Sequence, residues 1–412
     1  MMSSDEKPGP RPGPRPVTGR RRRAVVAASA AAVLALTACT SDGGAEGRGP
    51  GEAEGLDRVP SASSEQLTAA DTADLRLPTQ FDQLVTVEPA WDLPVQRGGD
   101  IFLSAEETDR ALVFRAVDSS GTVRWSAERP LACAGFVVTR DADGRDLAVL
   151  TDAETSDDDL SVTTASAYDL GSGEPVWGPV EVPGPHTGPG LVFEAPPEGF
   201  MGDGGEATVL DPTTGEPLEG DGGVIGEFDG TVLRTAGVEV IAETGSGAEW
   251  TSPLSELDAD PSTLEAHAAA EAADGLALLD TGDGVGPLLD LASGDVLARD
   301  VHDAARDPSS GTTALLDGDG LTVLDDAGEE QLSMSVRAGT TVEAVVGSLV
   351  YLRDGDTVRV HNGMTGSLAQ AYAQDGTGAV AVPGLVTEKG TGTLDAGART
   401  VLATNRPAGD SA

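Results

Sequence analysis

Between about residue 80 and residue 405, short segments of alternating apolar and polar residues are separated by Asp-Gly, Gly-Asp and Gly-Ser pairs. Residues 148–151, 231–234, 321–324 and 349–352 are examples of such segments. A period of two over short runs predicts β-strands, and the Gly- and Asp-containing pairs predict tight turns between them. Because the 3.6-residue period of amphipathic helices is scarce, the pattern predicts an all-β domain.

One stretch is compatible with a helix instead. Residues 262–273 are rich in Ala, and Ser262 and Glu265 have the spacing of a helix capping box. The stretch runs into Asp274-Gly275 and then into the apolar residues 276–279, which is the pattern of a hairpin. We therefore predict a strand here and keep a helix as the alternative.

A short element recurs along this region: a strand, an Asp, Glu or Asn, a short turn, a Gly and a second strand. The acidic or amide side chain can accept hydrogen bonds from backbone N–H groups of the turn, and Gly provides a positive φ before the next strand. The copies are Asp118 to Gly121, Asp169 to Gly173, Asp211 to Gly215, Glu243 to Gly247, Asp290 to Gly294, Asp325 to Gly328 and Asn362 to Gly366.

Three copies carry a tryptophan three or four residues after the Gly, namely Trp125, Trp177 and Trp250. A large ring that returns at this position is suited to packing between neighbouring sheets. The fullest copy is Ala167-x-Asp169-x-x-x-Gly173-x-x-x-Trp177, which resembles the tryptophan-docking repeat of the PQQ-like β-propellers. That family includes quinoprotein dehydrogenases and the outer-membrane assembly lipoprotein of the BAM machinery. The resemblance implies a propeller of four-stranded blades over residues 80–405.

The motif glycines between Gly121 and Gly366 recur on average about every 41 residues, which is the length of one four-stranded blade. Residues 80–405 hold eight blades of this length, whereas seven blades would need about 47 residues each. We predict eight blades, with seven as the alternative. The last blade combines strands from residues 379–403 with an N-terminal strand near residues 84–88, so that the two chain ends close the ring.

The first 38 residues have the order of a lipoprotein signal peptide. Arg20 to Arg23 form a basic segment, and the 12 apolar residues 24–35 follow it, too few to span a bilayer. Leu36, Thr37, Ala38 and Cys39 then resemble the bacterial lipobox, which implies acylation of Cys39. We expect a protein anchored to the outer face of the cell membrane, exported by the general or the twin-arginine route.

The chain after the cleavage site changes composition. Residues 39–79 are rich in Gly, Glu, Ser and Ala and bury little apolar area, so we expect a disordered tether. A disordered tail is expected at residues 406–412. The formal net charge of the whole chain is −43, with Lys389 as the one lysine after the signal peptide. This excludes the positive patch that nucleic-acid binding requires and indicates a strongly solvated, monomeric protein.

The sequence offers no recognisable catalytic constellation. The histidines at positions 186, 267, 302 and 361 are far apart and lack metal-ligand spacing, and Cys133 has no partner if Cys39 is acylated. Asp141 to Asp146 and Asp317 to Gly320 cluster oxygens, but neither has the closing Glu of a calcium loop, and hairpin turns explain both.

Quinoprotein dehydrogenases hold PQQ with stacking aromatic side chains and, in several groups, adjacent cysteines and calcium. Three of the four tryptophans stand at docking positions, which leaves only Trp91, and the sequence has no adjacent cysteines. We therefore expect no cofactor, neither PQQ nor calcium, and a non-catalytic binding or scaffold module for an envelope protein or glycan. The alternatives are a quinoprotein-like dehydrogenase and a small-ligand sensor that uses the central channel.

Overall fold

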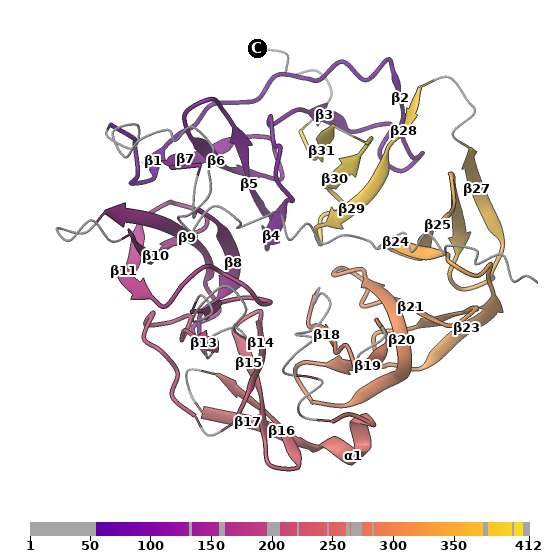
Figure 1. The fold of residues 1–412 in the computed structure, drawn as a ribbon. Coiled ribbons are helices and arrows are strands. Elements are labelled where there is room, and N and C mark those ends of the chain that lie inside the picture. The colour runs from indigo at the N-terminus through magenta and orange to yellow at the C-terminus, as the bar shows by residue number, and fades with distance from the viewer. Residues whose placement is uncertain are drawn as a thin grey trace, which may run out of the picture. The chain divides into compact units, whose positions relative to one another are not determined.

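The computed structural model describes residues 55–406 except 132–133, 156–160, 196–206, 221, 245–246, 261–263, 265–273, 282–283, 374–377 and 398. Within these residues the sheets follow one another around a ring, and in the four-stranded sheets whose strands are consecutive the first strand lies towards the centre and the last at the periphery (Figure 1). The protein is an all-β propeller, as the strand pattern predicts. The signal peptide, Cys39, Cys133, most of residues 262–273 and the tail after Arg406 lie outside the described residues.

Four sheets come first along the chain. Sheet 1 contains β4 (Gln96–Gly98), β5 (Ile101–Glu107), β6 (Leu112–Asp118) and β7 (Val123–Arg129). Sheet 2 contains β8 (Phe136–Arg140), β9 (Asp146–Thr155), β10 (Ser161–Asp169) and β11 (Pro175–Val182). Sheet 3 is the pair β12 (Val192–Glu194) and β13 (Ala207–Val209). Sheet 4 contains β14 (Val224–Phe228), β15 (Thr231–Ala236), β16 (Glu239–Thr244) and β17 (Gly247–Pro253).

The remaining sheets complete the ring. One helical turn, α1 (Leu254–Leu257), precedes sheet 5, which contains β18 (Leu276–Leu278), β19 (Gly286–Asp290), β20 (Val296–Arg306), β21 (Thr313–Asp317), β22 (Gly320–Leu324) and β23 (Glu330–Ser335). Sheet 6 contains β24 (Thr341–Val346), β25 (Leu349–Asp354), β26 (Thr357–Asn362) and β27 (Leu368–Ala373). Sheet 7 contains β29 (Val382–Val386), β30 (Gly392–Asp395), β31 (Thr400–Thr404) and β3 (Val85–Val87).

The predicted strands at residues 148–151, 231–234, 321–324 and 349–352 lie within β9, β15, β22 and β25. The central strands of a sheet are covered on both faces, because each sheet packs against its neighbours in the ring. In β5, for example, Phe102, Leu103, Ser104 and Ala105 are all fully buried.

Among the described residues, no helix has the length and apolarity needed to cross a bilayer.

The ring is closed by the two ends of the described chain. Strand β3 pairs antiparallel with β31, with Val85 opposite Thr404, Thr86 opposite Ala403 and Val87 opposite Leu402. This is the predicted pairing of an N-terminal strand with the C-terminal strands. It gives β31 a partner on its outer side and removes a free sheet edge at the point where the chain ends meet.

The expectation of a disordered tether up to residue 79 is wrong for residues 55–79, which we call the strap. Strand β1 (Ser61–Ala62) pairs with β7 as a fifth strand of sheet 1, and β2 (Leu75–Arg76) pairs in parallel with β28 (Ala379–Val380). Between them Ala69 forms a bridge with Val87 of β3. The strap therefore runs along the outside of sheets 1 and 7, over the place where the ring closes (Figure 1).

Partners distant in the sequence hold the strap in place. The Gln66 side-chain amide donates to the carbonyl oxygens of Ser120 and Gly121, both at 3.0 Å. The Arg399 guanidinium donates to the Asp71 carbonyl at 2.9 Å and to both carboxylate oxygens of Glu88. Arg406, assigned to the tail from the sequence, donates to the Leu67 carbonyl at 2.9 Å. The strap is thus held by these polar contacts together with the packing of Leu67, Leu75 and Leu77 against the apolar clusters of the closing sheets. Its composition alone does not reveal these contacts.

The recurring turn forms as its chemistry predicts in the copies that are described in full, whereas residues 245–246 of the copy from Glu243 to Gly247 lie outside the described residues. In the copy at Asp169, carboxylate oxygen Oδ1 accepts from the Ser172 N–H at 2.7 Å, and the Gly173 N–H donates to the Asp169 carbonyl at 2.8 Å. Gly173 has a φ of 73°. Asp307 forms the same turn with Gly311, a copy that the sequence analysis overlooked.

The tryptophans join each turn to the preceding sheet. The indole Nε1 of Trp125 donates to the Leu170 carbonyl, that of Trp177 to Pro212 and that of Trp250 to Leu291, each at 2.7 Å. Each acceptor directly follows the motif Asp of the next copy.

The motif glycines make room for these rings. A Cβ atom at Gly215 would lie 2.4 Å from the Trp177 ring, and one at Gly294 would lie 2.5 Å from the Trp250 ring. Where the tryptophan is missing, Leu332 takes the place next to Gly366, at 3.3 Å from the position of a Cβ. The motif glycine therefore serves two purposes. It adopts a positive φ in the turn, and because it has no side chain the ring from the neighbouring sheet can pack directly against its backbone.

Replacing Trp125 by Ala tests this contact where it is most buried. The Trp125 side chain is fully buried, whereas Trp177 is half-buried, so the two positions form a matched pair. We expect Trp125→Ala to lower the free energy of unfolding by about 3–5 kcal/mol and Trp177→Ala to lower it by less. The measurement is urea unfolding with the m-value checked for two-state behaviour. An unchanged midpoint for Trp125→Ala would show that the ring does not dock.

Candidate functional site

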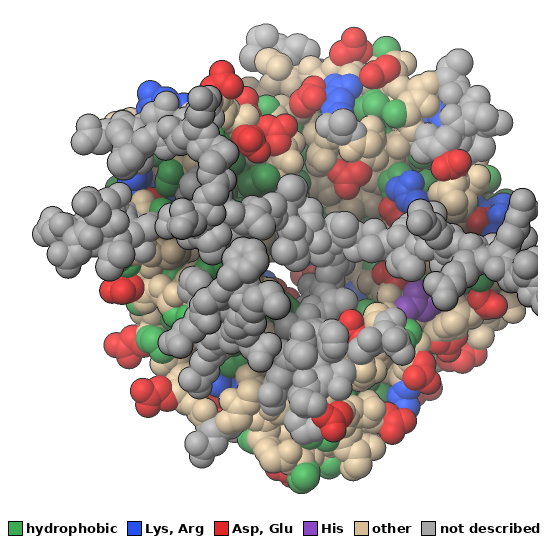
Figure 2. Space-filling model, viewed as in Figure 1, with side chains coloured by type: hydrophobic (Ala, Val, Ile, Leu, Met, Phe, Trp, Pro, Cys, Tyr) green, Lys and Arg blue, Asp and Glu red, His purple; other side chains and the backbone are tan. Residues whose placement is uncertain are grey.

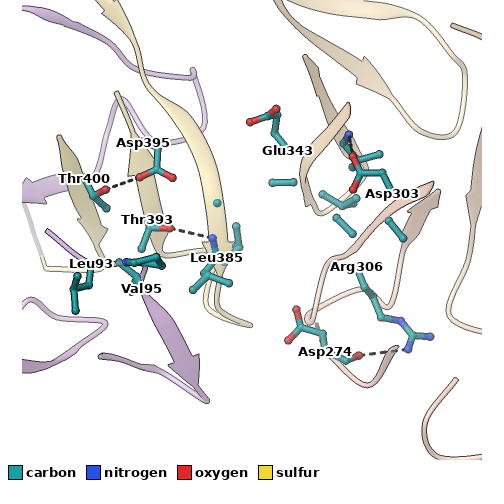
Figure 3. Close-up of a pocket in the computed structure, with 18 residues that line it drawn as sticks. Leu93, Val95, Asp274, Asp303, Arg306, Glu343, Leu385, Thr393, Asp395 and Thr400 are labelled. Carbon is teal, nitrogen blue, oxygen red and sulfur yellow. Dashed lines mark hydrogen bonds between the residues drawn. The ribbon is translucent and has the colours of Figure 1, made fainter. Parts of the chain in front are cut away.

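The centre of the ring contains a cavity of about 370 Å³. Its lining comes from the segments before β4 and before β18, from the second half of β20, and from β24, β29, β30 and the start of β31 (Figure 3). Leu93, Val95 and Leu385 form an apolar part of the lining. The polar part is dominated by carboxylates from different sheets. Among the described lining residues there is no histidine, cysteine or aromatic side chain.

One wall presents Asp303 and Glu343 (Figure 3). Oxygen Oδ2 of Asp303, in β20, accepts from the backbone N–H of Val342 in β24 at 2.7 Å and so ties sheet 5 to sheet 6. Glu343 forms a two-point ion pair with Arg353, at 2.7 and 2.9 Å. Hydrogen bonding to Glu343 raises the pKa of Arg353, although burial opposes this. Both carboxylates are therefore held in fixed positions.

The facing wall presents Asp395, Thr393 and Thr400 (Figure 3). The Thr400 hydroxyl donates to Asp395 Oδ1 at 2.6 Å, and the Thr393 hydroxyl oxygen accepts from the Leu385 N–H at 3.0 Å. A hydroxyl that donates to a carboxylate could in principle serve as a nucleophile. No imidazole stands among the described lining residues to accept its proton.

An ion pair crosses the centre of the ring at the edge of this cavity. Arg97 in β4 of sheet 1 pairs with Asp274, which lies just before β18 of sheet 5. These sheets are not neighbours in the ring, so the contact bridges its centre. Burial raises the pKa of Asp274, and the Arg97 guanidinium opposes that rise. The Asp274 carbonyl also accepts from Arg306 Nη1 at 3.5 Å (Figure 3).

The repeat residues singled out in the sequence lie elsewhere. None of the motif Asp, Gly or Trp residues lines the cavity, so their role is to join the sheets. Of the histidines, His361 contacts the Gly366 carbonyl within its turn at 3.1 Å, His186 contacts the Gly190 carbonyl, and His267 lies outside the described residues. The structure therefore does not bring the described histidines together.

The two oxygen clusters considered for calcium are hairpin turns. The Asp141 carboxylate accepts from the backbone N–H groups of Asp143 and Arg145 at 3.0 and 2.8 Å, which uses it to close the turn. The cluster at Asp317 lies in the hairpin between β21 and β22. Across the part of the chain that the structure describes, no group of three or more His, Cys, Asp or Glu side chains could hold a metal ion.

No motif in the sequence indicates the cavity carboxylates Asp303, Glu343 and Asp395. Glu343 is an acidic residue between apolar neighbours in β24, the first strand of sheet 6, whereas Asp303 lies in a more polar part of β20, near Asp300 and His302. A carboxylate in such a strand is a usable signal, because the strands nearest the centre of a propeller line its channel. The acidic side chains spread over the face of the ring in Figure 2 obscure this signal in the composition.

No protein-family model and no curated protein matches the chain. Several solved propellers resemble it. BamB from Moraxella catarrhalis is 14% identical with a TM-score of 0.43, and the match covers 78% of this chain and 98% of BamB. Sqt1 from Saccharomyces cerevisiae is 8% identical with a TM-score of 0.37, covering 84% and 100% of the two chains.

Apo AztD from Citrobacter koseri is 14% identical with a TM-score of 0.38, and the match covers 69% of this chain and 86% of AztD. At these identities and scores the likeness concerns the fold alone, and no property of these proteins is transferred to this chain.

The Arg97–Asp274 pair provides a test of the central geometry. The side chains are only 11% and 18% exposed, so Asp274→Leu would leave the Arg97 charge buried without its partner. We expect a loss of about 3–5 kcal/mol in the free energy of unfolding. The double variant Arg97→Met/Asp274→Leu should recover most of it, because an apolar pair then fills the site. Additive losses in the double-mutant cycle would contradict a direct contact across the ring.

Proposed function

We propose that the protein is a bacterial lipoprotein, held on the outer face of the cell membrane by an acylated Cys39. In this proposal its propeller is a non-catalytic binding or scaffold module for a protein or glycan of the envelope. The order of basic segment, apolar run and lipobox in residues 20–39 supports the anchor.

The lining of the central cavity is the observation that carries the binding function. Asp303, Glu343 and Asp395 hold their positions through a backbone N–H, an arginine and a threonine hydroxyl. Charges fixed before a partner arrives lower the cost of binding, because no side chain has to be ordered at that moment. A catalytic site would instead need a nucleophile or a proton-transfer pair positioned at the cavity.

The alternative of a quinoprotein-like dehydrogenase fits the cavity poorly. PQQ requires aromatic surfaces for stacking, and the described lining residues supply aliphatic side chains, carboxylates, an arginine and hydroxyls. Trp91, the tryptophan left over from the repeat, is buried against Val87 and Phe102 and is not among the lining residues. A small-ligand sensor remains the second candidate, because the cavity volume of about 370 Å³ suits a small molecule.

We further propose that the ring has eight blades. The 11-residue strand β20 pairs with β19 through its first half and with β21 through its second, and the two sets of pairs meet at Val301. Asp300, just before this point, has a φ of 54°. A non-glycine residue in the left-handed region marks a break in a strand. Sheet 5 then counts as two blades, which with sheets 1–4, 6 and 7 gives eight.

Crosslinking in the native cell tests the proposed function. The full-length protein with a C-terminal tag would be crosslinked, purified and compared with Cys39→Ser and with the cavity variant Asp303→Asn/Asp395→Asn. The exposed pair Asp109→Asn/Asp356→Asn is the matched control, since it removes the same charge elsewhere. We expect the wild type, and not Cys39→Ser, to partition into detergent with an acyl label. Among the anchored variants, we expect the crosslinked partner to be lost in the cavity variant and kept in the exposed control pair.

Three results would overturn the proposal. Wild-type protein that stays unlabelled in the aqueous phase would exclude the lipid anchor. A partner retained fully by the cavity variant would exclude the cavity as the binding surface. PQQ-dependent reduction of a dye by the wild type would establish the enzyme instead.

A further inference from the structure

One peptide group at the start of sheet 3 is held at both ends by titratable side chains. The N–H of Leu191 donates to Glu227 Oε2 at 3.0 Å. The carbonyl of the same peptide, that of Gly190, lies 2.5 Å from His186 Nε2, which must be the donor because a carbonyl only accepts. The His186 ring packs edge-on against Phe193 of β12, with ring centroids 5.9 Å apart. We call this arrangement the Gly190–Leu191 joint.

The joint connects three sheets through the carboxylate of Glu227. Oxygen Oε1 accepts from the Thr139 hydroxyl of β8 and from the Gly230 N–H of the β14–β15 turn, both at 2.6 Å. The Glu227 N–H also donates to the Pro189 carbonyl at 3.0 Å. Glu227 is 1% exposed. Sheet 2, the segment before β12 and sheet 4 therefore meet at a single buried carboxylate.

Gly190 is required at this position for two reasons. Its φ is 66°, and a Cβ atom there would lie 2.2 Å from both the Glu227 carbonyl oxygen and Oε2. In the described residues β12 and β13 share three residue pairs, and Leu191 and Phe193 also pack in an apolar cluster with residues of sheet 2. The joint adds a polar connection to this packing, at the point where the chain enters β12.

Two opposing effects act on the Glu227 carboxylate. Burial raises its pKa to about 7, and the charge of Asp229 adds to the rise. The three hydrogen bonds from Thr139, Gly230 and Leu191 oppose it, because they favour the charged form. Sheet 2 contributes the Thr139 hydroxyl and the backbone of Arg140 next to Gly230, while the Arg140 guanidinium pairs with Asp146. The segment before β12 contributes His186, whose pKa burial lowers despite its bond to Gly190.

The Thr139 hydroxyl can serve both protonation states of Glu227. It donates to the carboxylate, and it can accept from the protonated acid by rotating its hydrogen. The joint can therefore stay assembled when Glu227 takes up a proton, and the cost of a buried charge arises only when the proton leaves.

We propose that the Gly190–Leu191 joint is a pH-sensitive connection that is closed in mild acid and opens more readily as the pH rises to neutrality and above. The sign follows from linkage. A carboxyl with a higher pKa in the closed state than in water keeps its proton on closing, so closure is favoured below that range and weakened as the proton is lost. The rise from the ordinary value of 4.5 to about 7 corresponds to an opening constant up to about 300-fold larger above pH 7 than in acid.

His186 sets the lower limit of the closed range. Its pKa is below the ordinary 6.5 in the closed joint, so its protonation in acid favours opening. His186→Gln keeps a donor for the Gly190 carbonyl but cannot titrate. We expect this variant to lose the acid-side opening and to keep the fall in protection between pH 5.5 and 7.5.

Amide hydrogen exchange of the full chain tests the proposal. The protection factor of Leu191, corrected for the intrinsic pH dependence of exchange, should fall at least tenfold between pH 5.5 and 7.5 and then level off. The buried residue Val360 in β26 is the internal control and should keep a constant protection factor. Glu227→Gln should abolish the pH dependence at Leu191.

A second variant covers the case in which Glu227→Gln does not fold. Thr139→Val removes one donor to the carboxylate, so the midpoint of the Leu191 response should move to higher pH. A constant protection factor at Leu191 in the wild type would overturn the proposal. So would an equal fall at Val360, because that would show a change in global stability and not in the joint.

Discussion

A propeller holds together only if its last sheet is joined to its first, because each sheet otherwise contacts only its neighbours. Here the ring is closed by three residue pairs between β3 and β31. Such a short ladder is a weak closure, and the strap reinforces it from outside through Gln66, Arg399 and Arg406. The residues from 55 to β3 are therefore part of the fold.

With the ring closed, contacts between the sheets set the geometry of its centre. Tryptophan rings packed on motif glycines connect neighbouring sheets at their outer strands. The inner strands are connected by polar contacts, those of Asp303, of Glu227 and of the Arg97–Asp274 pair. The cavity carboxylates consequently face one another from different sheets at fixed positions. The Glu227 contact differs from the others, because its strength depends on a proton that is exchanged near neutral pH. The propeller thus combines a rigid centre with one joint that responds to its surroundings.

The parts of the structure that could be predicted from the sequence are those determined by local chemistry. An Asp with a Gly three or four residues later specifies its turn through local hydrogen bonds, as at Asp169 and Gly173. The alternation of apolar and polar residues specifies strands such as β22. Spacing between turns predicted which strands would meet at the closure. The strap could not be predicted, because its composition resembles a tether and its partners lie some 55 to 340 residues away. The cavity residues were missed for a similar reason: they share no motif and meet only once the ring forms.

The closure itself can be tested with a designed disulfide. Thr86→Cys and Ala403→Cys place thiols at directly paired positions of β3 and β31, in a chain where Cys39 and Cys133 are replaced by Ser. The account predicts that this pair oxidises in the folded protein and raises the free energy of unfolding by about 2–4 kcal/mol. The control pair Thr86→Cys/Leu402→Cys, with side chains on opposite faces of the sheet, should stay reduced. Thiols that remain free in the first pair, or oxidation that is equal in both, would contradict the closed ring.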